Sequence, residues 1–114
     1  MKIDFVKKNL SYKELEEIFK DISYVKLALL FGSRATKKHN SFSDYDIAVL
    51  TDSKDTWEFG RYWVDIATKL GIGEDDLDLI DLKKVNSFLL KNIKEKYIVI
   101  KGSEDEFLRL FGNK

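Results

Sequence analysis

Hydrophobic positions along this chain switch repeatedly between a spacing of three to four residues and a spacing of two. Residues 11–14 (SYKE) match a capping box, in which a Ser side chain and a Glu three residues later bind each other's backbone N–H groups. A helix is therefore predicted from there to about Asp21, with Leu15, Ile18 and Phe19 on its inner face. The spacing then changes, because residues 24–31 (YVKLALLF) form an apolar run typical of a buried strand.

Two more strands are predicted further along, and both carry aspartates. Residues 44–50 (DYDIAVL) form the second strand and residues 77–82 (LDLIDL) the third. Side chains alternate between the two faces of a strand, so Asp44 and Asp46 share one face while Tyr45 lies on the other. On the third strand, Asp78 and Asp81 lie on opposite faces by the same rule. Acidic side chains can thus gather on one side of the sheet.

The remaining segments predict helices that separate the strands. A long amphipathic helix is indicated over about residues 55–70, and Gly71 and Gly73 end it. Its apolar residues recur at helical spacing: Phe59, Tyr62, Trp63, Ile66 and Leu70. A helix over about residues 85–94, a short strand over residues 97–100 and a helix after the capping box of residues 103–106 complete the pattern. No repeat or linker divides the chain, so residues 1–114 are predicted to form a single α/β domain.

Composition narrows the chemistry that such a domain can carry. The sequence has 44% hydrophobic and 35% charged residues, which is typical of a folded globular protein and not of a disordered chain. It contains no cysteine, which excludes disulfides and thiolate metal sites. Its single histidine, His39, argues against a structural zinc site or a histidine-based catalytic triad. Any catalysis must therefore use carboxylates.

Charge and hydropathy give no sign of a nucleic-acid or membrane partner. Lys and Arg together equal Asp and Glu together at 20 each, so the chain has no overall field that attracts polyanions. No apolar run approaches the roughly 18 residues of a membrane span, and the first residues lack the apolar core of a signal peptide. A cytoplasmic location is expected.

One combination of motifs points to a particular chemistry. Gly32-Ser33 directly follows the first strand, ten residues intervene, and Asp44-Tyr45-Asp46 opens the second strand. Each part alone is uninformative, since the chain holds a second Gly-Ser pair and a second Asp-x-Asp. The whole stretch, GSRATKKHNSFSDYDIAVL, resembles the signature of the minimal nucleotidyltransferases of the DNA polymerase β superfamily.

The resemblance implies the nucleotidyltransferase fold, a small mixed β-sheet flanked by helices, with a metal and nucleotide site. The residues that it places in that site are Asp44, Asp46 and Asp78 as catalytic and metal-binding residues, and Gly32, Ser33 and Arg34 as nucleotide-binding residues. Physical chemistry agrees, because three converging carboxylates repel one another unless divalent cations lie between them. Hard carboxylate oxygens favour Mg²⁺ or Mn²⁺ as that cation.

Some details of this site stay open. A shifted strand register would present Asp76 or Asp81 in place of Asp78. Relatives often have a glycine a few residues after Gly-Ser, where this chain has Lys37 and Lys38, so the shape of the phosphate loop stays open. The two lysines lie close enough in sequence to neutralise phosphate charge.

The resemblance also implies a biological role. Minimal members of this family are typically paired with a HEPN-domain ribonuclease toxin and act as its antitoxin by moving AMP from ATP onto a toxin tyrosine. A nucleotidyltransferase that uses ATP and has a HEPN-domain toxin as its partner is therefore expected. The nucleotide preference, the acceptor and the formation of homo-oligomers stay open.

Two other functional classes compete with this interpretation. A non-catalytic protein could neutralise the same kind of partner by covering it with the aromatic helix of residues 57–70. A nucleic-acid-binding module could use the basic residues near the phosphate loop, although the balanced net charge argues against it.

Overall fold

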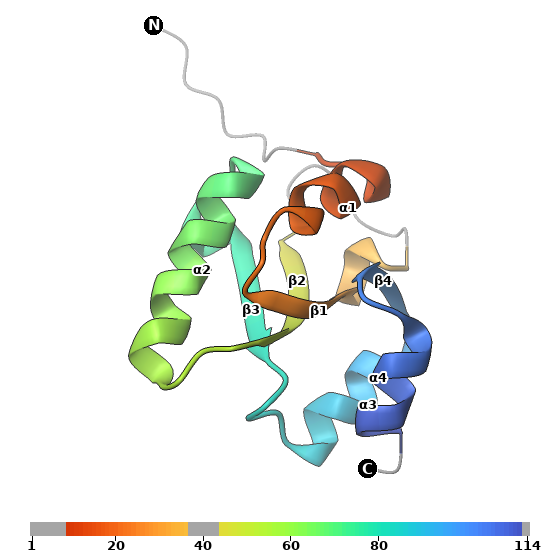
Figure 1. Ribbon diagram of the computed structural model, residues 1–114. Helices are drawn as coiled ribbons and strands as arrows, with labels where there is room; N and C mark the ends of the chain where they lie inside the picture. Colours follow the sequence, from red (N-terminus) through yellow and green to blue (C-terminus); the bar gives the residue numbers. More distant parts are fainter. Residues whose placement is uncertain (1–8, 37–43, 113–114) are drawn as a thin grey trace, which may run out of the picture.

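The computed structural model describes residues 9–36 and 44–112, and its centre is one four-stranded mixed sheet (Figure 1). The strands are β1 (Val25–Phe31), β2 (Tyr45–Thr51), β3 (Leu77–Asp81) and β4 (Tyr97–Lys101), and their order across the sheet is β3-β2-β1-β4. β1 pairs antiparallel with both β2 and β4, whereas β2 and β3 run parallel. The expected small mixed sheet flanked by helices is confirmed.

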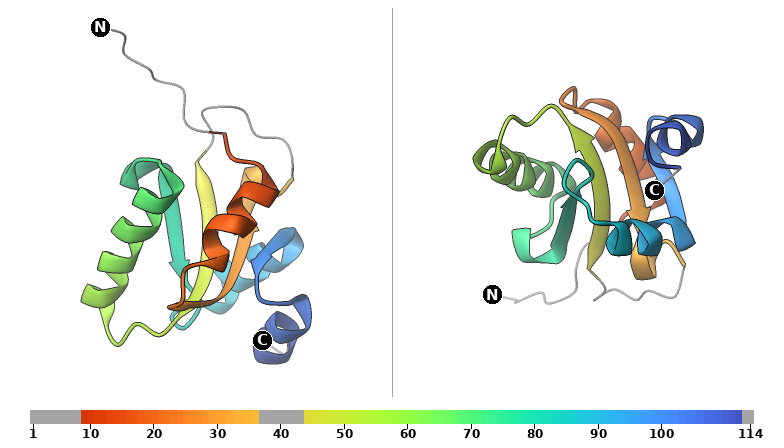
Figure 2. Two further views of the ribbon diagram at one scale, coloured as in Figure 1. Left: turned by 45° about the horizontal axis from the view of Figure 1, so that its top comes forward. Right: turned by 90° about the horizontal axis from the view of Figure 1, so that it is seen from below.

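Two pairs of helices cover the two faces of this sheet. The helices are α1 (Tyr12–Lys20), α2 (Thr56–Leu70), α3 (Ser87–Glu95) and α4 (Glu104–Phe111), with 3₁₀ turns η1 (Gly32–Arg34) and η2 (Glu74–Asp76). One hydrophobic cluster joins α1 and α2 to the sheet, and a second joins α3 and α4 to its other face (Figure 2). Alternate residues of β2 enter different clusters, since Ile47 belongs to the first and Ala48 to the second. The predicted two-residue alternation is therefore confirmed.

Local signals in the sequence explain where the helices begin and end. The reciprocal capping box of Ser11 and Glu14 is present at the start of α1. Asp55 caps the start of helix α2, because its side chain accepts the backbone N–H of Glu58. Gly71 caps the end of this helix in the left-handed conformation with φ 72°. After β1, the structure describes the turn η1 and two following residues; residues 37–43 lie outside the described part.

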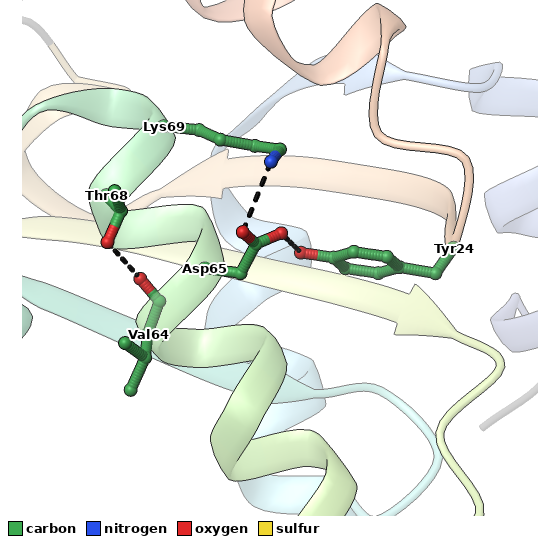
Figure 3. A network of polar contacts seen from close by, with 5 residues as sticks. All are labelled: Tyr24, Val64, Asp65, Thr68 and Lys69. Atoms are coloured by element: carbon green, nitrogen blue, oxygen red, sulfur yellow. Dashed lines mark hydrogen bonds and ion pairs between the residues drawn. The ribbon is translucent and has the colours of Figure 1, made fainter.

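A polar network fixes helix α2 to the start of β1 (Figure 3). The hydroxyl of Tyr24 donates to the Asp65 carboxylate at 2.7 Å, and Lys69 contacts the other oxygen of that carboxylate at 3.2 Å. The Tyr24 ring also stacks on Tyr62 with a centroid separation of 3.8 Å. The hydrogen bond from Tyr24 is the main reason why the pKa of Asp65 is lowered.

Within the described ranges, no helix is both long and apolar enough to cross a lipid bilayer.

Candidate active site

Two aspartates face each other across neighbouring strands near one end of the sheet. Asp46 of β2 is the register partner of Asp78 of β3. Asp44 directly precedes β2, and its charge acts on Asp46. Asp46 is partly buried, whereas the other two side chains are exposed. The three carboxylates that the sequence pattern grouped together therefore lie at one place in the fold.

The environment of Asp46 disfavours its negative charge. Burial, followed by repulsion from Asp78 and then from Asp44, raises the pKa of Asp46 from 3.8 to about 6. A hydrogen bond with Asp78 acts in the same direction. A bound cation would relieve the same repulsion, so this side chain has the electrostatics expected of a metal ligand.

The Gly-Ser turn lies directly against Asp46. Gly32 opens η1 with φ 72°, and a Cβ atom built on its backbone would stand 2.2 Å from the Asp46 carboxylate oxygen Oδ2. Only a residue without a side chain fits this approach. The backbone N–H groups of Ala35 and Thr36 both donate to the Gly32 carbonyl and close the turn. Ser33, the next residue of the turn, is exposed.

The Arg34 side chain is buried, whereas a residue in direct contact with a nucleotide is expected at the surface. Its side chain is only 2% exposed, and its guanidinium carbon Cζ lies 3.8 Å from the centroid of the Tyr45 ring. The guanidinium also donates to the side chain of Asn9 at 2.9 Å. Tyr45 belongs to the hydrophobic cluster on the α1 and α2 side, the face opposite to Asp46.

The strand register places neither Asp76 nor Asp81 opposite Asp46. Asp81 accepts the backbone N–H of Lys83 and stabilises the turn after β3. Asp76 lies in η2, with a carboxylate oxygen close to Gly73. The strand register thus brings Asp78 to Asp46. The predicted phosphate neighbours Lys37 and Lys38, and also His39, fall outside the described residues.

A divalent cation fits the chemistry of the carboxylates, although they do not surround a single point. In residues 9–36 and 44–112, no group of three or more His, Cys, Asp or Glu side chains is arranged so that it could hold a metal ion. Burial is the main reason why the pKa of Asp46 is raised, and the negative charges of Asp78 and Asp44 add to it. Hard oxygen donors with uncompensated charge are the ligands that Mg²⁺ prefers.

Sequence reasoning missed the residues that support this site from behind. Tyr12 donates its hydroxyl to the Arg34 carbonyl, and the Tyr45 hydroxyl accepts the backbone N–H of Leu10. These contacts join residues that are 22 and 35 positions apart, so no local sequence pattern predicts them. The alternation in β2 offered one usable signal, since it places Tyr45 behind the two aspartates that flank it.

Comparisons with known proteins find similar folds among solved structures. None of the curated proteins matches the chain significantly. A similar solved structure is a toxin–antitoxin complex with AMP-PNP, with 25% identity and a TM-score of 0.66 over 85% of this chain and 77% of that one. A second, at 24% identity and a TM-score of 0.58 over 84% and 76%, is a tri-AMPylated Shewanella oneidensis HEPN toxin in complex with an MNT antitoxin, and it shows the shared fold.

The family comparison covers most of the chain. The model of the family described as polymerase beta, nucleotidyltransferase matches residues 13–106, which include the Gly-Ser turn and all three aspartates. This chain therefore belongs to the polymerase β nucleotidyltransferase family.

Proposed function

We propose that this protein transfers AMP from ATP to the hydroxyl group of a tyrosine on a HEPN-domain toxin and thereby acts as its antitoxin. The contact of the Gly32 turn with Asp46, opposite Asp78, carries the proposal. It combines a phosphate-binding turn with a carboxylate group on one surface. The complexes with AMP-PNP and with an AMPylated HEPN toxin support the choice of nucleotide and acceptor. A cytoplasmic location, where ATP is available, fits the same proposal.

In this mechanism, Asp44, Asp46 and Asp78 would hold Mg²⁺ or Mn²⁺. When bound, the metal offsets charge on the triphosphate and favours ionisation of the attacking hydroxyl. The backbone N–H groups of the turn and the Ser33 hydroxyl donate to oxygens of the β- and γ-phosphates. Direct contact of Arg34 with the nucleotide stays a prediction.

The transfer itself is a substitution at the α-phosphorus. The tyrosine oxygen forms a bond to the α-phosphorus, the bond from that atom to the β-phosphate bridging oxygen breaks, and pyrophosphate leaves with the bonding electrons. Asp78, which is exposed and lies beside Asp46, accepts the proton of the hydroxyl.

The decisive experiment uses ATP labelled on the α-phosphate, Mg²⁺ and a HEPN-domain protein from the same source cells. Label on the HEPN-domain protein with the wild type, and none with Asp46→Asn, is expected. Mass spectrometry should then locate the added AMP on a tyrosine. Equal labelling by both forms would refute the assignment of Asp46.

One observation favours a second candidate, neutralisation by binding alone. Trp57 on α2 is 78% exposed and, with Gly60, Arg61 and Val64, lines an apolar groove. Large exposed aromatic side chains of this kind are common in protein interfaces. If binding alone neutralises the toxin, Trp57→Ala should abolish protection while Asp46→Asn preserves it. The opposite pattern supports the transferase.

A further inference from the structure

We infer that Arg34 is a positioning residue, which together with Asn9 and Tyr45 holds the Gly32–Ser33 turn in place against Asp46. The inference rests on the proposed function, because it concerns the same site. It assigns to Arg34 a task on the rear face of the sheet, behind the surface that carries the carboxylates.

The direction of the Arg34 side chain is the first argument. The guanidinium stacks on the Tyr45 ring, and both side chains are almost completely buried, at 2% and 0% exposure. Successive residues of a strand point to opposite faces, so the Tyr45 ring points away from Asp44 and Asp46. A guanidinium held on that ring lies on the far side of β2 from the three carboxylates.

The second argument is that one short segment contacts both Arg34 of the turn and Tyr45 of β2. Asn9 accepts a hydrogen bond from Arg34 Nη1 at 2.9 Å, and the Leu10 N–H donates to the Tyr45 hydroxyl at 2.8 Å. Tyr12 donates its hydroxyl to the Arg34 carbonyl at 2.9 Å, which fixes the turn through its backbone. Residues 9–12, which we call the strap, therefore tie the phosphate turn to the first residue of β2.

The energetics of a buried cation make this arrangement rigid. A guanidinium out of water needs hydrogen-bond acceptors and an electron-rich surface, and here Asn9 and the Tyr45 ring provide them. Removing Asn9 takes away one acceptor of this guanidinium, so the Arg34 side chain is held less firmly and the turn can shift. Gly32 touches the Asp46 carboxylate, so a small shift of the turn changes the site itself.

Asn9→Ala is the most informative variant, because Asn9 is exposed and its loss should leave the core intact. We expect kcat for AMP transfer to fall about tenfold, since misplaced reacting groups slow catalysis at this scale, while KM for ATP stays within about twofold. Asn9→Asp keeps an oxygen acceptor for Arg34 and should restore kcat to within about twofold of the wild type. Glu16→Gln, on the exposed side of α1, is the matched control and should change neither value.

Hydrogen–deuterium exchange without nucleotide gives a readout that does not depend on catalysis. The amides of Ala35 and Thr36 donate to the Gly32 carbonyl and report on the turn. Their exchange should be about tenfold faster in Asn9→Ala and in Arg34→Met than in the wild type, and unchanged in Asn9→Asp.

The outcomes separate this inference from the proposed function. Unchanged exchange and unchanged kcat in Asn9→Ala would overturn the positioning role. A rise in KM for ATP in Arg34→Met alone, with Asn9→Ala like the wild type, would overturn it in favour of direct nucleotide contact. A wild type that transfers no label would refute the proposed function, while faster turn exchange in Asn9→Ala would still support the strap.

Discussion

Gly32 and Asp46 touch so closely that the site has no room for a methyl group between them. A Cβ atom on Gly32 would lie 2.2 Å from Asp46 Oδ2, and the backbone there has φ 72°. Gly32→Ala should therefore lower the free energy of unfolding by about 1–2 kcal/mol, because an L-residue is strained at this φ and the carboxylate must move. Urea unfolding and ATP titration measure the two effects, and nucleotide binding should be lost. Normal ATP affinity in a folded Gly32→Ala variant would show that the turn does not bind phosphate.

Gly60 gives the opposite result from the same substitution. It lies on the exposed side of α2, and a Cβ atom there would meet nothing within 4 Å. Gly60→Ala should raise the free energy of unfolding by roughly 0.5–1 kcal/mol, because alanine loses less backbone entropy in a helix. It should leave ATP binding unchanged, which makes it the matched control for Gly32→Ala. A destabilised Gly60→Ala would mean that the solvent face of α2 is not free.

Asp46 should make the metal-free protein less stable at neutral pH. Its pKa rises from 3.8 to about 6 on folding, mainly through burial, so ionisation favours the unfolded state. The contribution of Asp46 to the free energy of unfolding should be most favourable below about pH 4 and should fall as the pH rises through about 6. With EDTA present at pH 7.5, Asp46→Asn should be about 1 kcal/mol more stable than the wild type, after allowance for its partial exposure to solvent. Equal stability of the two proteins at pH 7.5 would contradict the electrostatic account.

Mg²⁺ should reverse the order of stability, so that the wild type becomes more stable than Asp46→Asn. A cation between the carboxylates stabilises only the folded wild type, so its melting temperature should rise with Mg²⁺ concentration. Asp46→Asn should respond much less, and Mg²⁺ should not rescue its transfer activity. A thermal shift series from zero to saturating Mg²⁺ tests this, with Asp81→Asn as the control, since Asp81 caps a turn away from the group. Equal shifts in all three proteins would indicate nonspecific binding.

The Tyr24–Asp65 hydrogen bond has the opposite pH dependence. Because that bond lowers the pKa of Asp65, it stabilises the fold where the carboxylate is ionised and is lost as the pH falls through the folded-state pKa. Tyr24→Phe should lower the free energy of unfolding by about 1 kcal/mol at pH 7 and by less at pH 3. Guanidinium chloride unfolding at the two pH values measures this difference. A loss of the same size at both values would mean that the contribution of the Tyr24 hydroxyl does not depend on ionisation of Asp65.

Local sequence signals predicted most of the secondary structure and the acidic group. Capping residues such as Ser11 and Asp55 determine helix starts through contacts within four residues, so they are visible in the sequence. The shared face of Asp44 and Asp46 follows from strand geometry alone. The pairing of Asp46 with Asp78 needed one further condition, a parallel register between β2 and β3, which the sequence left open.

The rear of the site could not be predicted, because it depends on contacts between distant segments. Arg34 follows Gly-Ser directly, so proximity in sequence favoured a phosphate contact. Its buried position depends on Tyr45, eleven residues later, and on Asn9, 25 residues earlier. The chain has 19 other arginines and lysines. Only the tertiary structure shows that the Arg34 guanidinium lies over an aromatic ring.

The parallel register of β2 and β3 links enzymatic activity to the quality of refolding. A slip of one residue would place Leu77 or Leu79 opposite Asp46 and turn Asp78 to the other face. Such a molecule could retain its helices and much of its core, and circular dichroism would score it as folded. Its acidic group would be incomplete. AMP transfer per mole of protein is therefore a stricter measure of refolding yield than helix content, since it counts only molecules whose strands have paired in the native register.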